Sequence, residues 1–152
     1  MSDFVFILIV LAFIAAWLTS PRRPHNKRQA PKRSKSHAGR ERATCLRVID
    51  GDTIEVLLNG DVQRVRYIGV NAPELDQRGY AAALDYNRRL VEGKAITMER
   101  DRTDKDKYDR LLRYVWVNGL FVNAEMVRSG KAKMMAIKPN TSRIEEIAGN
   151  YL

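Results

Sequence analysis

Two Asn-Gly pairs, Asn59-Gly60 and Asn118-Gly119, limit the folds open to this chain more than any other feature of its sequence. Asn-Gly favours a two-residue type I′ turn because both residues tolerate positive φ angles. The first pair lies between the apolar runs 53–58 and 62–70 and predicts a β-hairpin. The second follows the apolar run 111–117, which also reads as a strand. We therefore expect a core built on short strands.

Further strands and helices follow from the spacing of apolar residues. Runs 44–49 and 95–99 read as strands, whereas apolar residues at helical spacing predict helices at 80–91 and at about 123–128. Ser142 and Glu145 form a capping-box signature that predicts a brief final helix. Five short strands with about three helices indicate an α+β fold, mainly β, organised as a five-stranded barrel of the OB type.

The first twenty residues differ from the rest in composition. Residues 4–18 read FVFILIVLAFIAAWL, an uninterrupted apolar run. As a helix this run would be about 22 Å long, somewhat short of the ~30 Å hydrocarbon core of a bilayer. We expect residues 1–20 to be a transmembrane anchor and the protein to be a single-pass membrane protein. The alternative is a signal segment whose cleavage yields a secreted or periplasmic protein.

Residues 21–42 carry nine Lys or Arg against one Glu. Their Pro, Ser and like charges show no apolar periodicity, so we expect a flexible basic linker. It could be a solvated spacer, or it could contact anionic lipid headgroups or nucleic-acid phosphates. The folded domain is then expected over residues 43–152, as a monomer.

The expected domain contains few of the residue types that usually carry catalysis. Both histidines, His25 and His37, lie in the basic linker, and Cys45 is the only cysteine. The domain therefore has no intrachain disulfide, and a histidine-containing catalytic triad or a histidine-ligated zinc site is disfavoured. Chemistry in this part of the chain would use carboxylates, arginines and a metal ion.

Two aspartates, Asp50 and Asp52, flank Gly51 in the motif VIDGDTIEV. In extended chain, residues two apart face the same side, and two carboxylates on one face suit a hard cation such as calcium. The alternative is a turn that happens to contain two aspartates.

Two later motifs add complementary groups. In VRYIGVNAPEL, Arg66, Asn71 and Glu74 place a guanidinium, an amide oxygen and a carboxylate at a strand end and the loop after it. In DKDKYDRLLRYVWVNG, Lys107, Tyr108 and Arg110 precede another strand. Each residue taken singly also has an ordinary explanation as a solvated or turn residue.

With these motifs in order, the chain resembles the staphylococcal (micrococcal) nuclease family, also called thermonucleases, over about residues 43–142. The motifs that carry the resemblance are VIDGDTIEV, VRYIGVNAPE, DKYDRLLRYVWVNG and VNAEMVRSGKAK followed by KPN. The resemblance implies an OB-fold barrel with helices. It also implies a calcium-dependent enzyme that hydrolyses phosphodiester bonds in DNA and RNA with little sequence preference.

The resemblance further implies a role for nine residues, in three groups. The calcium ligands would be Asp50, Asp52, Asn71 and the backbone carbonyl of Ala72. The catalytic residues would be Arg66 and Arg110, which grip the scissile phosphate, and Glu74, which acts as general base or orients the attacking water. The residues that contact a terminal phosphate of the nucleotide would be Lys107 and Tyr108.

Two of the chain's departures from the family concern the candidate site. Asn71 stands where an aspartate is frequent, and a neutral ligand should weaken calcium affinity. Residues 135–137 read Met-Ala-Ile where well-studied members have tyrosines that stack on the base.

The acidic run 101–109 lacks the pattern of an EF-hand and reads as a solvated loop. The alternative to an enzyme is a non-catalytic OB-fold module, tethered to a membrane, that binds nucleic acid or a protein.

Overall fold

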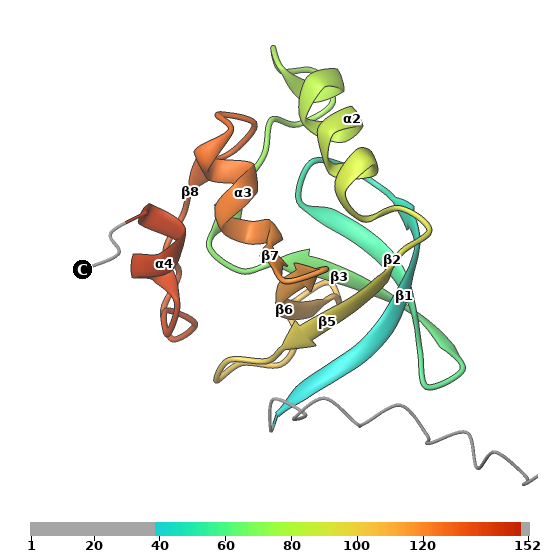
Figure 1. The fold of residues 1–152 in the computed structure, drawn as a ribbon. Coiled ribbons are helices and arrows are strands. Elements are labelled where there is room, and N and C mark those ends of the chain that lie inside the picture. The colour runs from blue at the N-terminus through green and yellow to red at the C-terminus, as the bar shows by residue number, and fades with distance from the viewer. Residues whose placement is uncertain (1–38, 150–152) are drawn as a thin grey trace, which may run out of the picture. The chain divides into compact units, whose positions relative to one another are not determined.

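A long first strand, β1 (Arg40–Val48), pairs with two neighbours in a computed structural model that describes residues 39–149 (Figure 1). The first half of β1 pairs antiparallel with β5 (Ala95–Glu99), and its second half pairs antiparallel with β2 (Thr53–Leu58). The register shifts near Cys45, at a bulge. A bulge bends a strand, so β1 can turn the corner of a barrel.

The barrel closes through a parallel pair. Strand β3 (Asp61–Tyr67) follows β2 as a hairpin and also pairs in parallel with β6 (Leu111–Val117), which itself pairs with β5. The order around the barrel is β1-β2-β3-β6-β5, consistent with the expected OB-type fold. A short strand β7 (Leu120–Phe121) pairs antiparallel with the end of β6.

A second, two-stranded sheet lies beside the barrel. Its strands are β4 (Val70–Asn71), which soon follows β3 along the chain, and β8 (Lys133–Met134). In the register of this pair, Asn71 lies opposite Lys133.

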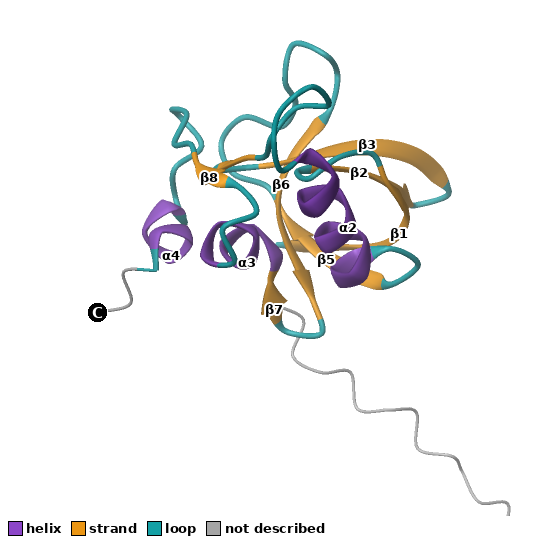
Figure 2. Cartoon of the chain, turned by 90° about the horizontal axis from the view of Figure 1, so that it is seen from above, coloured by secondary structure: helices purple, strands orange, loops and turns teal. Residues whose placement is uncertain are grey.

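Three helices cover the barrel within the described residues. Helix α2 (Tyr80–Val91) lies across the barrel mouth in the view from above (Figure 2). It buries Ala83, Asn87 and Val91, which are four residues apart and therefore share one helix face. Helices α3 (Val122–Arg128) and α4 (Ile144–Ala148) pack together through a smaller apolar cluster that includes Ile147 and Phe121.

Most predicted elements are confirmed. Asn59 and Gly60 have φ angles of 54° and 96°, and Asn118 and Gly119 have 49° and 85°, as type I′ turns require. Helix α2 occupies residues 80–91 as predicted, and the strand predicted at 62–70 is divided into β3 and β4. The strand β7 was not predicted because two residues are too short for a period to show.

Two predictions were wrong. Residues 40–42, which the sequence places in the flexible linker, form the start of β1 and pair with β5. Arg40 is half-buried and Arg42 is exposed on this strand. Their charges resemble those of the linker in sequence, but their backbone is held by the sheet. The capping box at Ser142 also fails. Helix α4 has Arg143 at its N-cap with no side-chain cap, and the Ser142 N–H donates to Asp101 instead.

The predicted anchor at residues 4–18 and the linker up to residue 38 lie outside the described residues, so both stay predictions. Within residues 39–149, no helix is long and apolar enough to cross a membrane.

Candidate active site

The loop between β1 and β2 carries Asp50 and Asp52. Both aspartates lie in this turn and not on a strand, so the expectation of two carboxylates on one strand face is wrong. The turn is closed by the N–H of Ile49, which donates to the Thr53 carbonyl at 2.9 Å. The Asp50 side chain accepts the Asp52 N–H at 2.9 Å. The pair is therefore held together by local hydrogen bonds.

Gly51 allows this loop to pack closely against the rest of the site. A Cβ at Gly51 would lie 2.5 Å from the Cβ of Ala72 and 2.9 Å from that of Ala83. Contacts this short do not occur between real side chains, so any larger residue would push the loop away from β4 and α2. The glycine in the motif thus brings Asp52 next to Ala72.

Asp52 is a buried carboxylate with three partners. Its Oδ2 atom accepts the Ala72 N–H at 2.6 Å and lies 3.0 Å from Nη2 of Arg66. Its Oδ1 accepts the Thr53 hydroxyl at 3.2 Å. Burial raises the pKa of Asp52 to about 7, although Arg66 and the Ala72 N–H both lower it. Asp52 therefore lies where a further positive charge would stabilise its ionised form.

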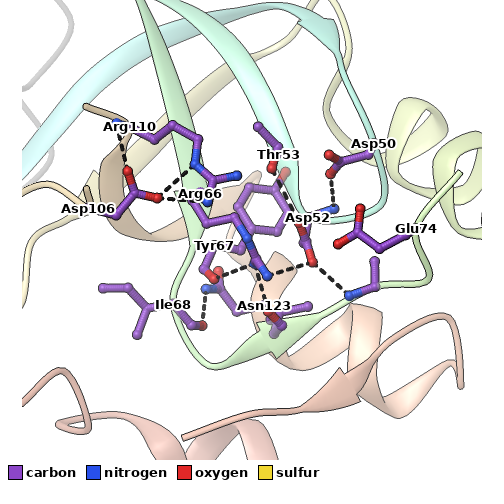
Figure 3. A network of polar contacts seen from close by, with 12 residues as sticks. Asp50, Asp52, Thr53, Arg66, Tyr67, Ile68, Glu74, Asp106, Arg110 and Asn123 are labelled. Atoms are coloured by element: carbon purple, nitrogen blue, oxygen red, sulfur yellow. Dashed lines mark hydrogen bonds and ion pairs between the residues drawn. The ribbon is translucent and has the colours of Figure 1, made fainter. Parts of the chain in front are cut away.

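Arg66, at the end of β3, is held rigidly. Its Nη1 donates to the carbonyls of Tyr67 at 3.1 Å and Val70 at 2.7 Å, and its Nη2 contacts Asp52. The Nε–H has no partner among residues 39–149, so this edge of the guanidinium can donate to a ligand. Figure 3 shows Arg66 between Asp52 on one side and the Asp106–Arg110 loop on the other.

Arg110 is positioned by Asp106. Its Nε donates to Asp106 Oδ2 at 2.7 Å, and its backbone N–H donates to Oδ1 at 3.0 Å. The same carboxylate accepts the Tyr108 N–H at 2.9 Å. Burial raises the pKa of Asp106, but these hydrogen bonds outweigh it and leave the pKa below its usual value. One ionised side chain thus shapes the whole loop.

Lys107 and Tyr108 project from that loop. The Tyr108 side chain is exposed, and its ring lies 4.9 Å from the Lys107 ammonium and 5.4 Å from the Arg110 guanidinium carbon. Cations near an aromatic face attract it electrostatically, so the exposed ring and both cations form one patch.

Arg66 and Arg110 line the same cleft, which has a volume of about 290 Å³. An apolar part of its wall is formed by Met135, Ile137 and Pro139. These three residues carry no aromatic ring, as the sequence shows for the residues before Lys138. The cleft therefore offers two guanidiniums and an apolar, non-aromatic wall.

Glu74 lies in the exposed loop after β4. Its backbone forms a tight turn, with Gln77 Oε1 accepting the Glu74 N–H at 3.1 Å. In Figure 3 the Glu74 carboxylate points toward Asp50 and Asp52, and it has no side-chain partner among the described residues. It is the one candidate catalytic group that no ion pair holds.

The predicted metal ligands form a mixed oxygen set. Within the described part of the chain, no three carboxylate, histidine or cysteine side chains gather closely enough to hold an ion alone. Asp50 and Asp52, with the Asn71 amide and the Ala72 carbonyl, would supply the hard oxygen donors that calcium prefers. Burial raises the pKa of Asp52, and a cation bound beside it would favour the charged carboxylate.

Two supporting residues were missed by sequence reasoning. Buried Asn87 on α2 donates to the Asp50 carbonyl at 3.1 Å and accepts the Tyr67 hydroxyl at 3.0 Å, which fixes the Asp50 loop against β3. Asp106 was assigned to a solvated acidic loop. Asp109 is exposed, as that assignment requires. Asp106, Asp101 and Asp104 are half-buried instead, and the last two contact Tyr114 and Arg113 respectively. The sequence does contain a signal for this role of Asp106: an aspartate, which can accept backbone N–H groups of a turn, stands four residues before an arginine.

Comparison with known proteins relates this site to one family. A family model described as "Staphylococcal nuclease homologue" matches residues 64–149. The chain is 33% identical over 118 residues to a thermonuclease of Staphylococcus hyicus, which covers 74% of this chain and 70% of that protein. It is 34% identical over 116 residues to a thermonuclease of Staphylococcus intermedius, covering 72% and 68%.

A third relative is longer. Endonuclease YncB of Bacillus subtilis is 37% identical over 111 residues, covering 68% of this chain and 53% of that protein. The chain thus spans about half the length of this relative.

Proposed function

The chain belongs to the staphylococcal nuclease family and is a hydrolase of the nuclease class, and on that premise we propose that it cleaves phosphodiester bonds of DNA and RNA with calcium as its metal. The observation that carries the proposal is the convergence of Arg66 and Arg110, from distant parts of the chain, on one cleft beside buried Asp52.

The two arginines would stabilise the transition state. Attack of water on phosphorus builds negative charge on the phosphate oxygens, and guanidiniums aimed at those oxygens bind the transition state more strongly than the ground state. Arg66 is already fixed by Asp52 and two carbonyls, and Arg110 by Asp106. Little reorganisation is therefore needed when the phosphate enters.

Glu74 would act as general base. An unpaired, exposed carboxylate that points toward the aspartates can accept a proton from the attacking water. Calcium bound by Asp50, Asp52, Asn71 and the Ala72 carbonyl would supply a Lewis acid that polarises the phosphate and acidifies a water. Lys107 and Tyr108 would hold a further phosphate of the nucleotide at the rim of the cleft.

The absence of aromatic residues from the apolar wall supports broad substrate choice. Met135 and Ile137 offer apolar contact to any base but no hydrogen-bond readout. Recognition would therefore rest on phosphates, which DNA and RNA share.

The test is cleavage of a DNA strand and an RNA strand of the same sequence by the full chain, with calcium and then with excess chelator. We expect cleavage of both strands with calcium, none with chelator, and a large loss in Arg110→Ala. Arg100→Ala is the control, because Arg100 is an exposed cation that lines neither the cleft nor the loop. Strand binding without calcium-dependent hydrolysis would contradict the proposal and support a non-catalytic module.

A further inference from the structure

A second cleft, of about 370 Å³, is also lined by a residue of β4. Val70 lines the first cleft, and the next residues, Asn71 and Ala72, line the second. Asn71 is also a predicted calcium ligand. The second cleft therefore borders two of the predicted calcium ligands, Asn71 and Ala72.

Three cations from two separate segments line this cleft. Lys133 lies opposite Asn71 in the β4–β8 pair, and paired residues present their side chains on the same face. Lys131 comes from the turn after α3, which is fixed by the N–H groups of residues 131 and 132 donating to the Met126 carbonyl at 3.0 Å. Arg78 comes from a different segment, the loop before α2.

The positive charge of this cleft is not neutralised locally. None of its lining residues carries a carboxylate. Arg78 and Lys133 make no ion pair with any residue from 39 to 149, and Lys131 has only the Tyr86 ring, 6.0 Å from its ammonium. By contrast, Lys105, Arg110 and Arg143 each contact a carboxylate within 3 Å.

The lining is also poor in groups that read bases. Apart from the cations and two side-chain amides, the cleft is walled by small residues such as Ala72, Ala82 and Gly130. Without an aromatic platform, a ligand would be held through repeated negative charge. A polynucleotide backbone has that character, and it must leave the first cleft on one side of the scissile phosphate.

We propose that the second cleft is a subsite for the substrate strand, in which Arg78, Lys131 and Lys133 bind phosphates beyond the scissile one. The inference rests on the proposed nuclease function and adds to it a path for the strand across β4. It assigns long strands, rather than dinucleotides, as the preferred substrate. Contacts to phosphates alone carry no sequence information, so the subsite would raise affinity without adding specificity.

Binding can test the subsite separately from cleavage. The full chain is titrated, in chelator, with a labelled single strand of about 20 nucleotides, longer than the ~4–16 that one such barrel covers. Each phosphate contact contributes about −0.7 to the slope of log K against log salt for a single strand. The triple variant Arg78→Gln, Lys131→Gln, Lys133→Gln should therefore lower the magnitude of the slope by about 2.

The matched control removes the same charge elsewhere. Arg42, Arg64 and Arg100 are exposed cations that line neither cleft, and their triple Gln variant should change the slope by less than about 1. Equal slopes for the wild type and the cleft variant, or equal losses in both triple variants, would overturn the subsite.

Cleavage gives the second readout. With calcium, the cleft variant should raise KM for the long strand about tenfold or more and leave kcat/KM for a dinucleotide within about twofold. Equal losses on both substrates would overturn the subsite, because they would show damage to the catalytic centre. If the wild type cleaves neither substrate, the proposed function fails, and the salt slope in chelator still decides whether the second cleft binds the strand.

Discussion

Asp106 holds both the side chain and the backbone of Arg110, with its Oδ2 atom 2.7 Å from Nε and its Oδ1 atom 3.0 Å from the backbone nitrogen. The loop that carries Tyr108 and Arg110 is thus folded around one carboxylate. An arginine must point at its phosphate to stabilise a transition state, so the position of Arg110 depends on Asp106.

Loss of Asp106 should therefore mimic loss of Arg110. We expect Arg110→Ala to raise the barrier by about 2.7 to 4 kcal/mol, by analogy with removal of one oxyanion donor. Asp106→Ala should cost at least about 1.4 kcal/mol, or tenfold in kcat, and the double variant should cost no more than Arg110→Ala. Single-turnover rates for the four proteins form the double-mutant cycle. Asp109→Asn is the control, because asparagine tolerates the positive φ angle of residue 109 (63°) and removes the charge. Strictly additive losses would contradict the coupling.

The sequence predicts the barrel well because its signals are local. The Asn59-Gly60 and Asn118-Gly119 turns and the apolar spacing of 80–91 each depend on a few neighbouring residues. Closure of the barrel could not be predicted from such local signals. The parallel pairing of β3 with β6 joins residues more than forty positions apart, from Val65 to Leu111, and no period in the sequence records it.

The resemblance to family motifs predicted the residues of the candidate site, but it did not predict the residues that hold them in position. The structure brings Asp50, Asp52, Arg66 and Arg110 together, as expected, while their chemical roles stay predictions. Asn87 and Asp106 were missed because a buried amide and a loop-capping aspartate look ordinary in sequence. What gives them a role is a contact made only after folding.

Glu41 belongs to the folded domain, although the sequence places it in the linker. It contacts the buried guanidinium of Arg113, with Glu41 Oε2 2.6 Å from Nε. Because the Glu41 side chain is 39% exposed, Glu41→Gln should lower the free energy of unfolding by about 1 to 2 kcal/mol, less than the ~3 to 5 for a fully buried pair. Urea unfolding measures this. Glu55→Gln is the control, because its partner Arg47 is 64% exposed, whereas Arg113 is buried, and it should change little. Equal losses in Glu41→Gln and Glu55→Gln would show that the Glu41–Arg113 contact stabilises no more than a surface ion pair.

Asn71 should set the metal requirement. An aspartate at this position would add one negative charge to the oxygen set, and calcium affinity rises with ligand charge. We expect Asn71→Asp to lower the calcium concentration for half-maximal cleavage about tenfold. Asn118→Asp, in a turn remote from the site, is the control. An unchanged calcium requirement in Asn71→Asp would show that residue 71 is not a ligand.

Asp101 should make stability acid-sensitive. Burial raises its pKa, but hydrogen bonds from the Ser142 N–H and the Tyr114 hydroxyl outweigh burial and leave the pKa below its usual value. The unfolded chain then binds more protons, so the stabilisation is complete above the unfolded pKa and is lost as the pH falls through the folded one.

Asp101→Asn should therefore be less stable than the wild type at neutral pH and should lose less stability between about pH 5 and pH 3. Urea unfolding across this range checks the slope. Asp61→Asn, at an exposed carboxylate, should keep the wild-type slope. A slope in Asp101→Asn equal to or steeper than that of the wild type would contradict the role of Asp101.

Glu74 offers the sharpest test of the proposed mechanism, because its carboxylate is exposed and has no side-chain partner among residues 39–149. Its loss therefore cannot disturb the fold through a broken contact. The measurement is kcat for strand cleavage at saturating calcium in Glu74→Gln and in Asp76→Asn, an exposed neighbour in the same loop. We predict a fall of about 10²-fold or more in Glu74→Gln, with an unchanged Tm, and no change in Asp76→Asn. A kcat in Glu74→Gln within about threefold of the wild type would show that Glu74 is not the general base.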